Sequence, residues 1–349
     1  MTPLMLDPSA GQAFWLPLIF MVLMAVAMLA YVILDGYDLG VGVLMRRAEP
    51  AQQDTMVASI GPFWDANETW LVLGIGLLLV AFPVAHGEIL GALYVPVALM
   101  LAGLILRGVA FDFRVKAQDR HRPLWNRAFY AGSLLASVSQ GVMLGQYITG
   151  FQSDAAGWVF ALFVGACLTS GYVLLGAGWL LIKTEGELQR RAVRWARTSL
   201  WLTAAGVLAV SVATPLVSPR IFAKWFALPE MIALAPIPLA TLALFALAHV
   251  FLRRLSQDAA AGNERGLQRW CWAPFACTLG IFVLAFCGLA YSLYPYLVVD
   301  RITIWQAASA PGSLMFILVG VVVVLPAIIG YTIYAYRVFW GKAGALSYD

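Results

Sequence analysis

Six ionisable residues lie in three short motifs within the first third of the chain. They are Asp35, Asp38, Asp65, Glu68, Arg107 and Asp112. Carboxylates that are close together and have partial access to water can pass protons, and their oxygens can also bind a hard cation. A third interpretation is purely structural, in which the acids pair with nearby arginines. The sequence alone leaves proton transfer, a cation site and structural ion pairs as open alternatives.

The surroundings of these residues are strongly apolar. Of the 349 residues, 62% are hydrophobic and 11% are charged, and the mean hydropathy is +0.83. A soluble domain has about 25% charged residues, so the composition excludes a soluble, disordered or disulfide-stapled chain and predicts a protein embedded in lipid. An ionisable side chain at membrane depth is costly, and is therefore a functional-site hypothesis by default.

The hydropathy pattern predicts nine transmembrane helices, because each span needs about 20 mostly apolar residues. The fold class is an all-α integral membrane protein, arranged as two four-helix bundles plus a peripheral helix. Residues 1–150 are expected to form an N-terminal four-helix bundle that carries the membrane-embedded acids, and residues 151–349 a C-terminal five-helix region. The nine spans are 12–45, 61–83, 87–112, 126–149, 156–182, 197–217, 230–252, 271–294 and 314–339.

Basic residues predict the orientation of the chain. Of the 22 Lys and Arg residues, 18 fall in segments on one side of the spans, namely 46–47, 114–127, 183–197, 253–269 and 337–342. The positive-inside rule makes that side cytoplasmic, with the N-terminus outside (periplasmic) and the C-terminus inside. Topology thus accounts for the net charge of +4, and no nucleic-acid partner is indicated.

This topology places all five acids toward the cytoplasmic side. Asp35 and Asp38 are three residues apart, as are Asp65 and Glu68, so each pair shares a helix face and could point into one cleft. Arg107 lies about 7.5 Å along the helix axis from Asp112, on a different face. Its charge is the deepest, so it must find a carboxylate from another helix or from a partner.

Two further features concern packing. Gly36, Gly40 and Gly42 form a small-residue strip with a G-x-x-x-G spacing, which lets another helix approach closely. The longest outer segment, 294–311, is expected either to dock on a partner or to fold over the helices.

Only three histidines are present, His86, His121 and His249, and no two are expected on one helix face. A chain that carried its own haems would need facing axial ligands.

The three motifs resemble those of subunit II of the cytochrome bd-type quinol oxidases, including the cyanide-insensitive branch. They are D-G-Y-D-L-G-V-G (35–42), G-P-F-W-D-A-N-E-T-W (61–70) and R-G-V-A-F-D-F-R (107–114), in that order. The resemblance implies a haem-free subunit II beside a larger haem-binding subunit I with haem b and haem d, or haem b in place of haem d. It also allows a small accessory subunit. The implied complex lies in the bacterial inner membrane, where it oxidises quinol and reduces oxygen to water.

The resemblance also implies roles for the acids. Asp65 and Asp112 match carboxylates of a proton route at the subunit interface, and Glu68 is an extra carboxylate where family members have glutamine. Asp35, Asp38 and Arg107 are supporting charges, and Asp38 with Asp65 could hold a cation. None of these residues is implied to bind a haem.

A proton- or cation-coupled secondary transporter is the alternative function. It predicts a site at the membrane midplane and broken helices in both halves of the chain. The acids of this chain are instead confined to one half and to one side.

Overall fold

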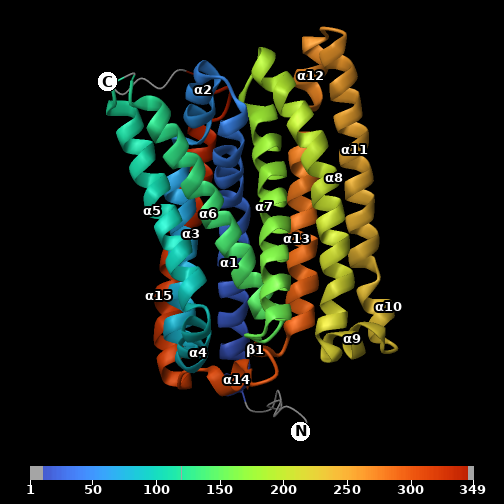
Figure 1. The fold of residues 1–349 in the computed structure, drawn as a ribbon. Coiled ribbons are helices and arrows are strands. Elements are labelled where there is room, and N and C mark those ends of the chain that lie inside the picture. The colour runs from blue at the N-terminus through green and yellow to red at the C-terminus, as the bar shows by residue number, and fades with distance from the viewer. Residues whose placement is uncertain (1–10, 119, 345–349) are drawn as a thin grey trace.

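The computed structural model describes residues 11–118 and 120–344, and these residues are almost entirely helical. Nine long helices in this part of the chain run along one common direction (Figure 1). They are α1 (Gln12–Leu44), α3 (Trp64–Ala81), α5 (Tyr94–Lys116), α6 (Arg122–Ile148), α7 (Ala155–Lys183), α8 (Gly186–Val217), α11 (Pro236–Ala260), α13 (Ala273–Leu293) and α15 (Pro311–Val338).

Among the described residues, eight helices are long and apolar enough to cross a membrane. The one remaining predicted span, 126–149, corresponds to α6, whose 27 residues extend about 40 Å at 1.5 Å per residue. Its hydropathy is lowered by polar side chains such as Ser133, Ser137 and Gln140, which are buried inside the bundle. The chain is therefore the all-α, multi-pass membrane protein that its composition predicts.

Short elements lie at the two ends of the bundle, and most were not predicted. A 3-10 turn (Met45–Arg47), α2 (Pro50–Ile60) and α12 (Glu264–Trp270) lie at one end, where the five segments rich in Lys and Arg are also found (Figure 1). The opposite end holds α4 (Pro83–Ala92), α9 (Pro219–Phe226), α10 (Glu230–Leu234), α14 (Ile304–Ala307) and the strands β1 (Tyr296–Val298) and β2 (Ile302–Thr303). The strands pair antiparallel, with Tyr296 opposite Thr303.

Three predicted spans differ clearly from the observed helices. The predicted span 230–252 corresponds to α11, which runs from Pro236 to Ala260. The predicted span 87–112 is two helices, α4 and α5, because the backbone leaves the helical geometry at Leu93. The predicted span 197–217 begins earlier, since α8 extends back to Gly186 through a polar stretch that hydropathy cannot detect. This stretch carries ion pairs of Glu187 with Arg191 and Arg194.

Glycines allow α1 and α7 to pack backbone against backbone, as the G-x-x-x-G spacing predicts. A Cβ atom at Gly40 would lie 1.8 Å from the carbonyl oxygen of Tyr172, and one at Gly176 would lie 2.4 Å from the amide nitrogen of Val41. Such distances are far inside van der Waals contact. The two helices thus join the first group of helices (α1, α3, α5, α6) to the second (α7, α8, α11, α13). The domain division at residue 150 remains a prediction.

The segment 294–311 folds over the helix ends. The indole Nε1 of Trp305 donates to the carbonyl oxygen of Phe14 at 3.2 Å, and the hydroxyl of Tyr147 donates to that of Leu297 at 2.6 Å. The amide of Ser309 donates to the carbonyl oxygen of Ala81 at 2.8 Å. These bonds tie the segment to α1, α6 and α3.

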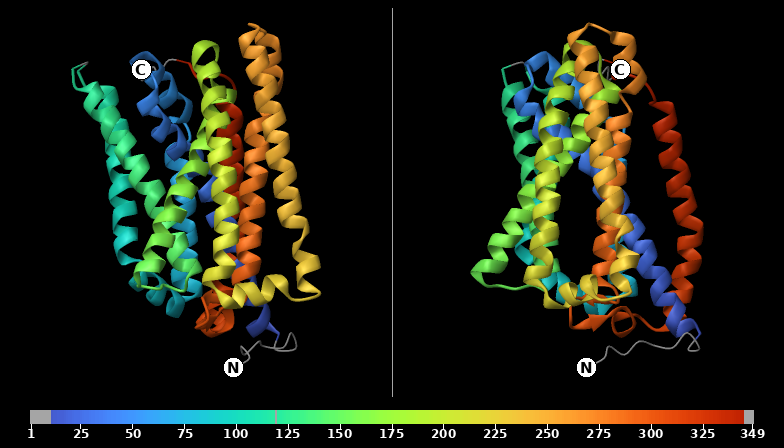
Figure 2. Two further views of the ribbon diagram at one scale, coloured as in Figure 1. Left: turned by 45° about the vertical axis from the view of Figure 1, so that its right-hand side comes forward. Right: turned by 90° about the vertical axis from the view of Figure 1, so that its right-hand side faces the viewer.

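The last long helix, α15, lies at the edge of the bundle (Figure 2). Leu314 is its only buried residue. Near its other end, however, Tyr336 reaches the polar interior of the first group of helices. This helix matches the predicted peripheral helix.

Candidate functional site

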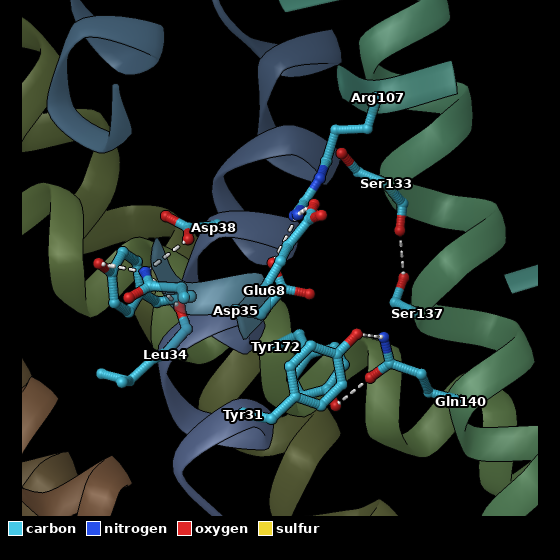
Figure 3. Close-up of polar contacts among 12 residues, drawn as sticks. Tyr31, Leu34, Asp35, Asp38, Glu68, Arg107, Ser133, Ser137, Gln140 and Tyr172 are labelled. Atoms are coloured by element: carbon cyan, nitrogen blue, oxygen red, sulfur yellow. Dashed lines mark hydrogen bonds and ion pairs between the residues drawn. The ribbon is translucent and has the colours of Figure 1, made fainter. Parts of the chain in front are cut away.

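A buried ion pair lies at the centre of the candidate site. Arg107 on α5 has 1% of its side chain exposed, and its Nη2 atom donates to Asp35 Oδ1 on α1 at 2.6 Å. The same Nη2 donates to Glu68 Oε1 on α3, whose side chain is 27% exposed (Figure 3). Arg107 thus takes its carboxylates from two other helices of the same chain, and the prediction that it must find such a partner is confirmed.

Asp38 lies one turn further along α1 in a second buried group. Its Oδ2 atom accepts a hydrogen bond from Asn67 Nδ2 at 2.8 Å, and the same amide donates to the hydroxyl of Tyr37 at 2.9 Å. The hydroxyl of Tyr336 donates to Asn67 Oδ1 at 3.2 Å and lies 2.6 Å from that of Tyr37. The last helix of the chain therefore completes the surroundings of an acid on the first helix.

A third polar group lies beside the ion pair. Gln140 on α6 donates to the hydroxyl of Tyr31 at 2.7 Å and accepts from that of Tyr172 at 2.6 Å (Figure 3). All three side chains are buried. They were missed in the sequence because only charged residues were sought there. A tyrosine or glutamine in an apolar helix could have been found in the same way, since its polar tip at membrane depth indicates a hydrogen bond to another helix.

Four buried polar atoms of the ion pair and of Asp38 have no hydrogen-bond partner among the described residues. They are Asp35 Oδ2, Asp38 Oδ1, Arg107 Nε and Arg107 Nη1. Buried polar groups are nearly always paired. These two carboxylate oxygens and two guanidinium nitrogens therefore remain able to form further hydrogen bonds.

Asp65 and Asp112 are not part of this interior. Both are exposed, and neither has a hydrogen bond or ion pair within the described part of the chain. Their neighbours Trp64 and Phe111 touch, with ring centroids 4.9 Å apart, so the start of α3 lies against the end of α5. The expectation that Asp65 and Glu68 share one cleft is not met, because Glu68 reaches inward to Arg107 while Asp65 is exposed.

The cation predicted at Asp38 and Asp65 remains a prediction. Asp38 is completely buried beside Asn67, and Asp65 is exposed. Within residues 11–118 and 120–344, no group of three or more His, Cys, Asp or Glu side chains could hold a metal ion.

The three histidines lie on different elements. His86 is on α4, His121 precedes α6 at the opposite end of the bundle, and His249 is on α11 beside Trp201, with ring centroids 5.3 Å apart. No pair of imidazoles faces one point in the described bundle. These side chains do not fit the pair of axial ligands that a six-coordinate haem needs.

Known proteins resemble this chain along nearly its whole length. The family model "Cytochrome bd terminal oxidase subunit II" matches residues 16–339. The chain belongs to this family. The match includes parts of all nine long helices and all six ionisable residues of the three motifs. Membership makes the chain a subunit of an oxidoreductase complex of the respiratory chain, and it implies a subunit I partner.

Individual relatives of the cytochrome bd family agree with this assignment. The chain is 28% identical to cytochrome bd ubiquinol oxidase subunit 2 of Bacillus subtilis over 342 residues, which is 92% of this chain and 95% of the relative. It is 29% identical to cytochrome bd-I ubiquinol oxidase subunit 2 of Escherichia coli over 202 residues, 53% of each chain. The solved bd oxidase from Geobacillus thermodenitrificans matches with a TM-score of 0.75 at 19% identity, covering 93% of this chain and 98% of that one. This match supports the fold.

Proposed function

We propose that this chain is the haem-free subunit of a bd-type complex that oxidises quinol and reduces oxygen to water. In this proposal the chain supports the haem-binding subunit I and contributes a route for protons from the cytoplasmic side. Asp65, Asp112 and Glu68 carry the protons, and Asp35, Asp38 and Arg107 set the charge of the interior. The basic end of the bundle faces the cytoplasm, which places the N-terminus outside and the C-terminus inside, although both termini lie beyond the described residues.

The position of Glu68 is the observation that carries this proposal. Its carboxylate is 27% exposed and binds Arg107, which also binds the fully buried Asp35. Asp65 lies three residues before Glu68 on the same helix and is exposed. Glu68 therefore stands between an acid at the surface and an acid in the interior, which is the arrangement that stepwise proton transfer requires.

The charge balance of the interior supports the same function. Three carboxylates, those of Asp35, Asp38 and Glu68, lie in the polar interior, and the guanidinium of Arg107 binds two of them, Asp35 and Glu68. Excess negative charge is costly in a low-dielectric interior, and a bound proton relieves it. The unpaired Asp35 Oδ2 and Asp38 Oδ1 atoms are positions where such a proton could reside.

The exposed acids support an interface with another protein. Asp65 and Asp112 lie in two candidate membrane spans, α3 and α5, and both lack a partner in the described chain. Acids at membrane depth face protein or a water-filled cavity rather than lipid. We therefore place subunit I over the contact of α3 with α5. The haems and the quinol reaction belong to that subunit in this proposal, since the histidines of this chain do not fit a haem.

Replacement of the surface acids tests the proton route. We expect Asp65→Asn and Asp112→Asn each to lower quinol-dependent oxygen consumption by the purified complex about tenfold or more, because a general proton-transfer group contributes about 100-fold to 10,000-fold. The haem absorbance spectrum should stay unchanged. Glu88→Gln is the matched control, because Glu88 is an exposed, unpaired acid on α4 at the opposite end of the bundle.

The outcomes separate the parts of the proposal. Normal turnover in both aspartate variants would remove the proton route while leaving the oxidase assignment intact. A chain that purifies alone, without a larger subunit or haem absorbance, would instead favour the coupled transporter.

A further inference from the structure

A groove lies at the basic end of the bundle, on a part of the surface that neither the five motif acids nor Arg107 lines. It has a volume of about 500 Å³ and is walled by the end of α1 with the following turn, and by α6, α7 and α8. Its size falls within the range of about 300–1,000 Å³ that is typical of small-molecule sites. None of the residues discussed for proton transfer lines it.

The two ends of the groove differ in chemistry. Arg46 and Arg47 line the end that lies beyond the last turn of α1. Val173 on α7 and Leu202 on α8 line it within the spans. Leu202 is 58% exposed on the outer surface of α8, so the groove opens sideways to the membrane rather than only to water.

The two arginines carry uncompensated charge. Both are exposed, and neither pairs with a carboxylate among the described residues; the guanidinium of Arg46 lies 5.5 Å from the ring centroid of Tyr130. Glu49, the nearest acid along the chain, is bound by Arg191 instead. Two positive charges at the rim of the groove therefore remain available to an anion.

The serine and threonine hydroxyl groups along the groove already have partners. Thr169 donates to the carbonyl oxygen of Gly165, and Ser199 donates to that of Trp195, each within its own helix. A polar ligand would find few free donors there. The inner part of the groove thus acts as an apolar surface.

We propose that this groove binds one anionic phospholipid. Arg46 and Arg47 hold its phosphodiester at the level of the lipid headgroups, and one acyl chain lies along Val173 and Leu202. An anionic lipid satisfies both ends of the groove, whereas free phosphate satisfies only the arginines and a neutral quinone tail only the apolar part. The site is independent of the proposed proton route.

Lipid binding to the intact purified complex tests this proposal. After delipidation, the complex is titrated with dioleoylphosphatidylglycerol or dioleoylphosphatidylcholine, and bound lipid is counted by native mass spectrometry. We expect one phosphatidylglycerol to bind in preference to phosphatidylcholine. The double variant R46Q/R47Q should weaken this binding about thirtyfold, since each basic residue contributes roughly a factor of five at an anionic membrane surface.

Two further variants keep the test independent of folding. R253Q/R254Q is the matched control, because these residues form another exposed arginine pair near the same end, with Arg254 lying 5.3 Å from the ring centroid of Trp270, outside the groove. It should bind phosphatidylglycerol like the wild type. Leu202→Trp keeps both arginines but fills the apolar end, and it should also weaken binding.

Three results would overturn the proposal. Equal binding of the two lipids, or undiminished phosphatidylglycerol binding to R46Q/R47Q, would show that the arginines do not select an anionic headgroup. Competition by inorganic phosphate at the concentration of the lipid would show an anion site without a lipid. Failure of Thr198→Cys, which lies in the groove, to react with a maleimide in the delipidated complex would show that another protein covers it.

Discussion

Replacement of Arg107 probes the ion pair at the centre of the bundle. Arg107 and Asp35 each have 1% of their side chains exposed. Arg107→Leu would leave the Asp35 carboxylate buried without a counter-charge, and breaking a buried pair in this way costs about 3–5 kcal/mol. Glu68, at 27% exposure, can remain partly hydrated and should add little. We expect a strongly reduced yield of intact complex.

The geometry predicts a much milder effect of lysine. Both carboxylates bind the same Nη2 atom, and Nε and Nη1 have no partner among the described residues. One ammonium group has three donors and can serve two carboxylates. Lysine keeps the charge and at least one of the two bonds, so Arg107→Lys should cost no more than about 1 kcal/mol, the value of one hydrogen bond.

Unfolding of the purified complex by increasing mole fractions of dodecyl sulfate in mixed micelles measures both effects. The double variant R107L/D35L provides the control, because replacing a buried ion pair by apolar groups is often neutral, and it should recover most of the stability lost in R107L. Equal damage by lysine and leucine would refute the argument from a single shared nitrogen. A double variant no better than R107L would refute the argument from an orphaned charge.

Three further predictions concern helix packing at Gly40, the buried hydroxyl of Tyr336, and Lys224 at the outer end of the bundle. Gly40→Ala should abolish assembly, because its Cβ would overlap a carbonyl oxygen of α7, whereas Gly76→Ala, with nothing within 4 Å of its Cβ, should leave the yield of complex unchanged. Tyr336→Phe should lower stability in the same dodecyl sulfate titration by about 1 kcal/mol for its lost hydrogen bonds, and the exposed Tyr334→Phe should not. Burial lowers the pKa of Lys224 in α9. Between the lowered and the ordinary pKa the unfolded chain therefore binds more protons than the folded chain, and stability should rise with pH. Lys224→Met should flatten this rise in thermal unfolding measured from pH 7 to 10.

The sequence predicted the parts of the fold and site that depend on local composition. Nine apolar segments correspond to nine long helices, and the rarity of charge at membrane depth directed attention to Arg107 and its acids. The G-x-x-x-G spacing also predicted close packing at Gly40. These features follow from the cost of placing polar groups in lipid, which acts on each residue separately.

Features that depend on the direction of a side chain could not be predicted in this way. Asp65 and Glu68 are three residues apart, yet Asp65 is exposed and Glu68 binds Arg107 on the neighbouring α5. Asn67 lies between them in sequence and binds Asp38 instead. Helical periodicity gives an approximate face, whereas these contacts depend on side-chain length and on the position of the neighbouring helix.

Contacts between distant parts of the chain were also beyond sequence reasoning. Tyr336 meets Tyr37 across 299 positions, and no local pattern connects them. The segment 294–311 allowed two outcomes, and only the fold shows that it closes over the helix ends.

The contact of Tyr336 with Asn67 has a consequence for the biosynthesis of the protein. The ribosome delivers α15 after all the other long helices, and Leu314 is the only buried residue that α15 supplies to the bundle. Until this helix inserts, Asn67 beside Asp38 lacks one of its hydrogen-bond donors. A chain truncated before α15 would hold every acid of the three motifs but leave this group incomplete, so the polar interior reaches its final form only when translation of the last span is complete.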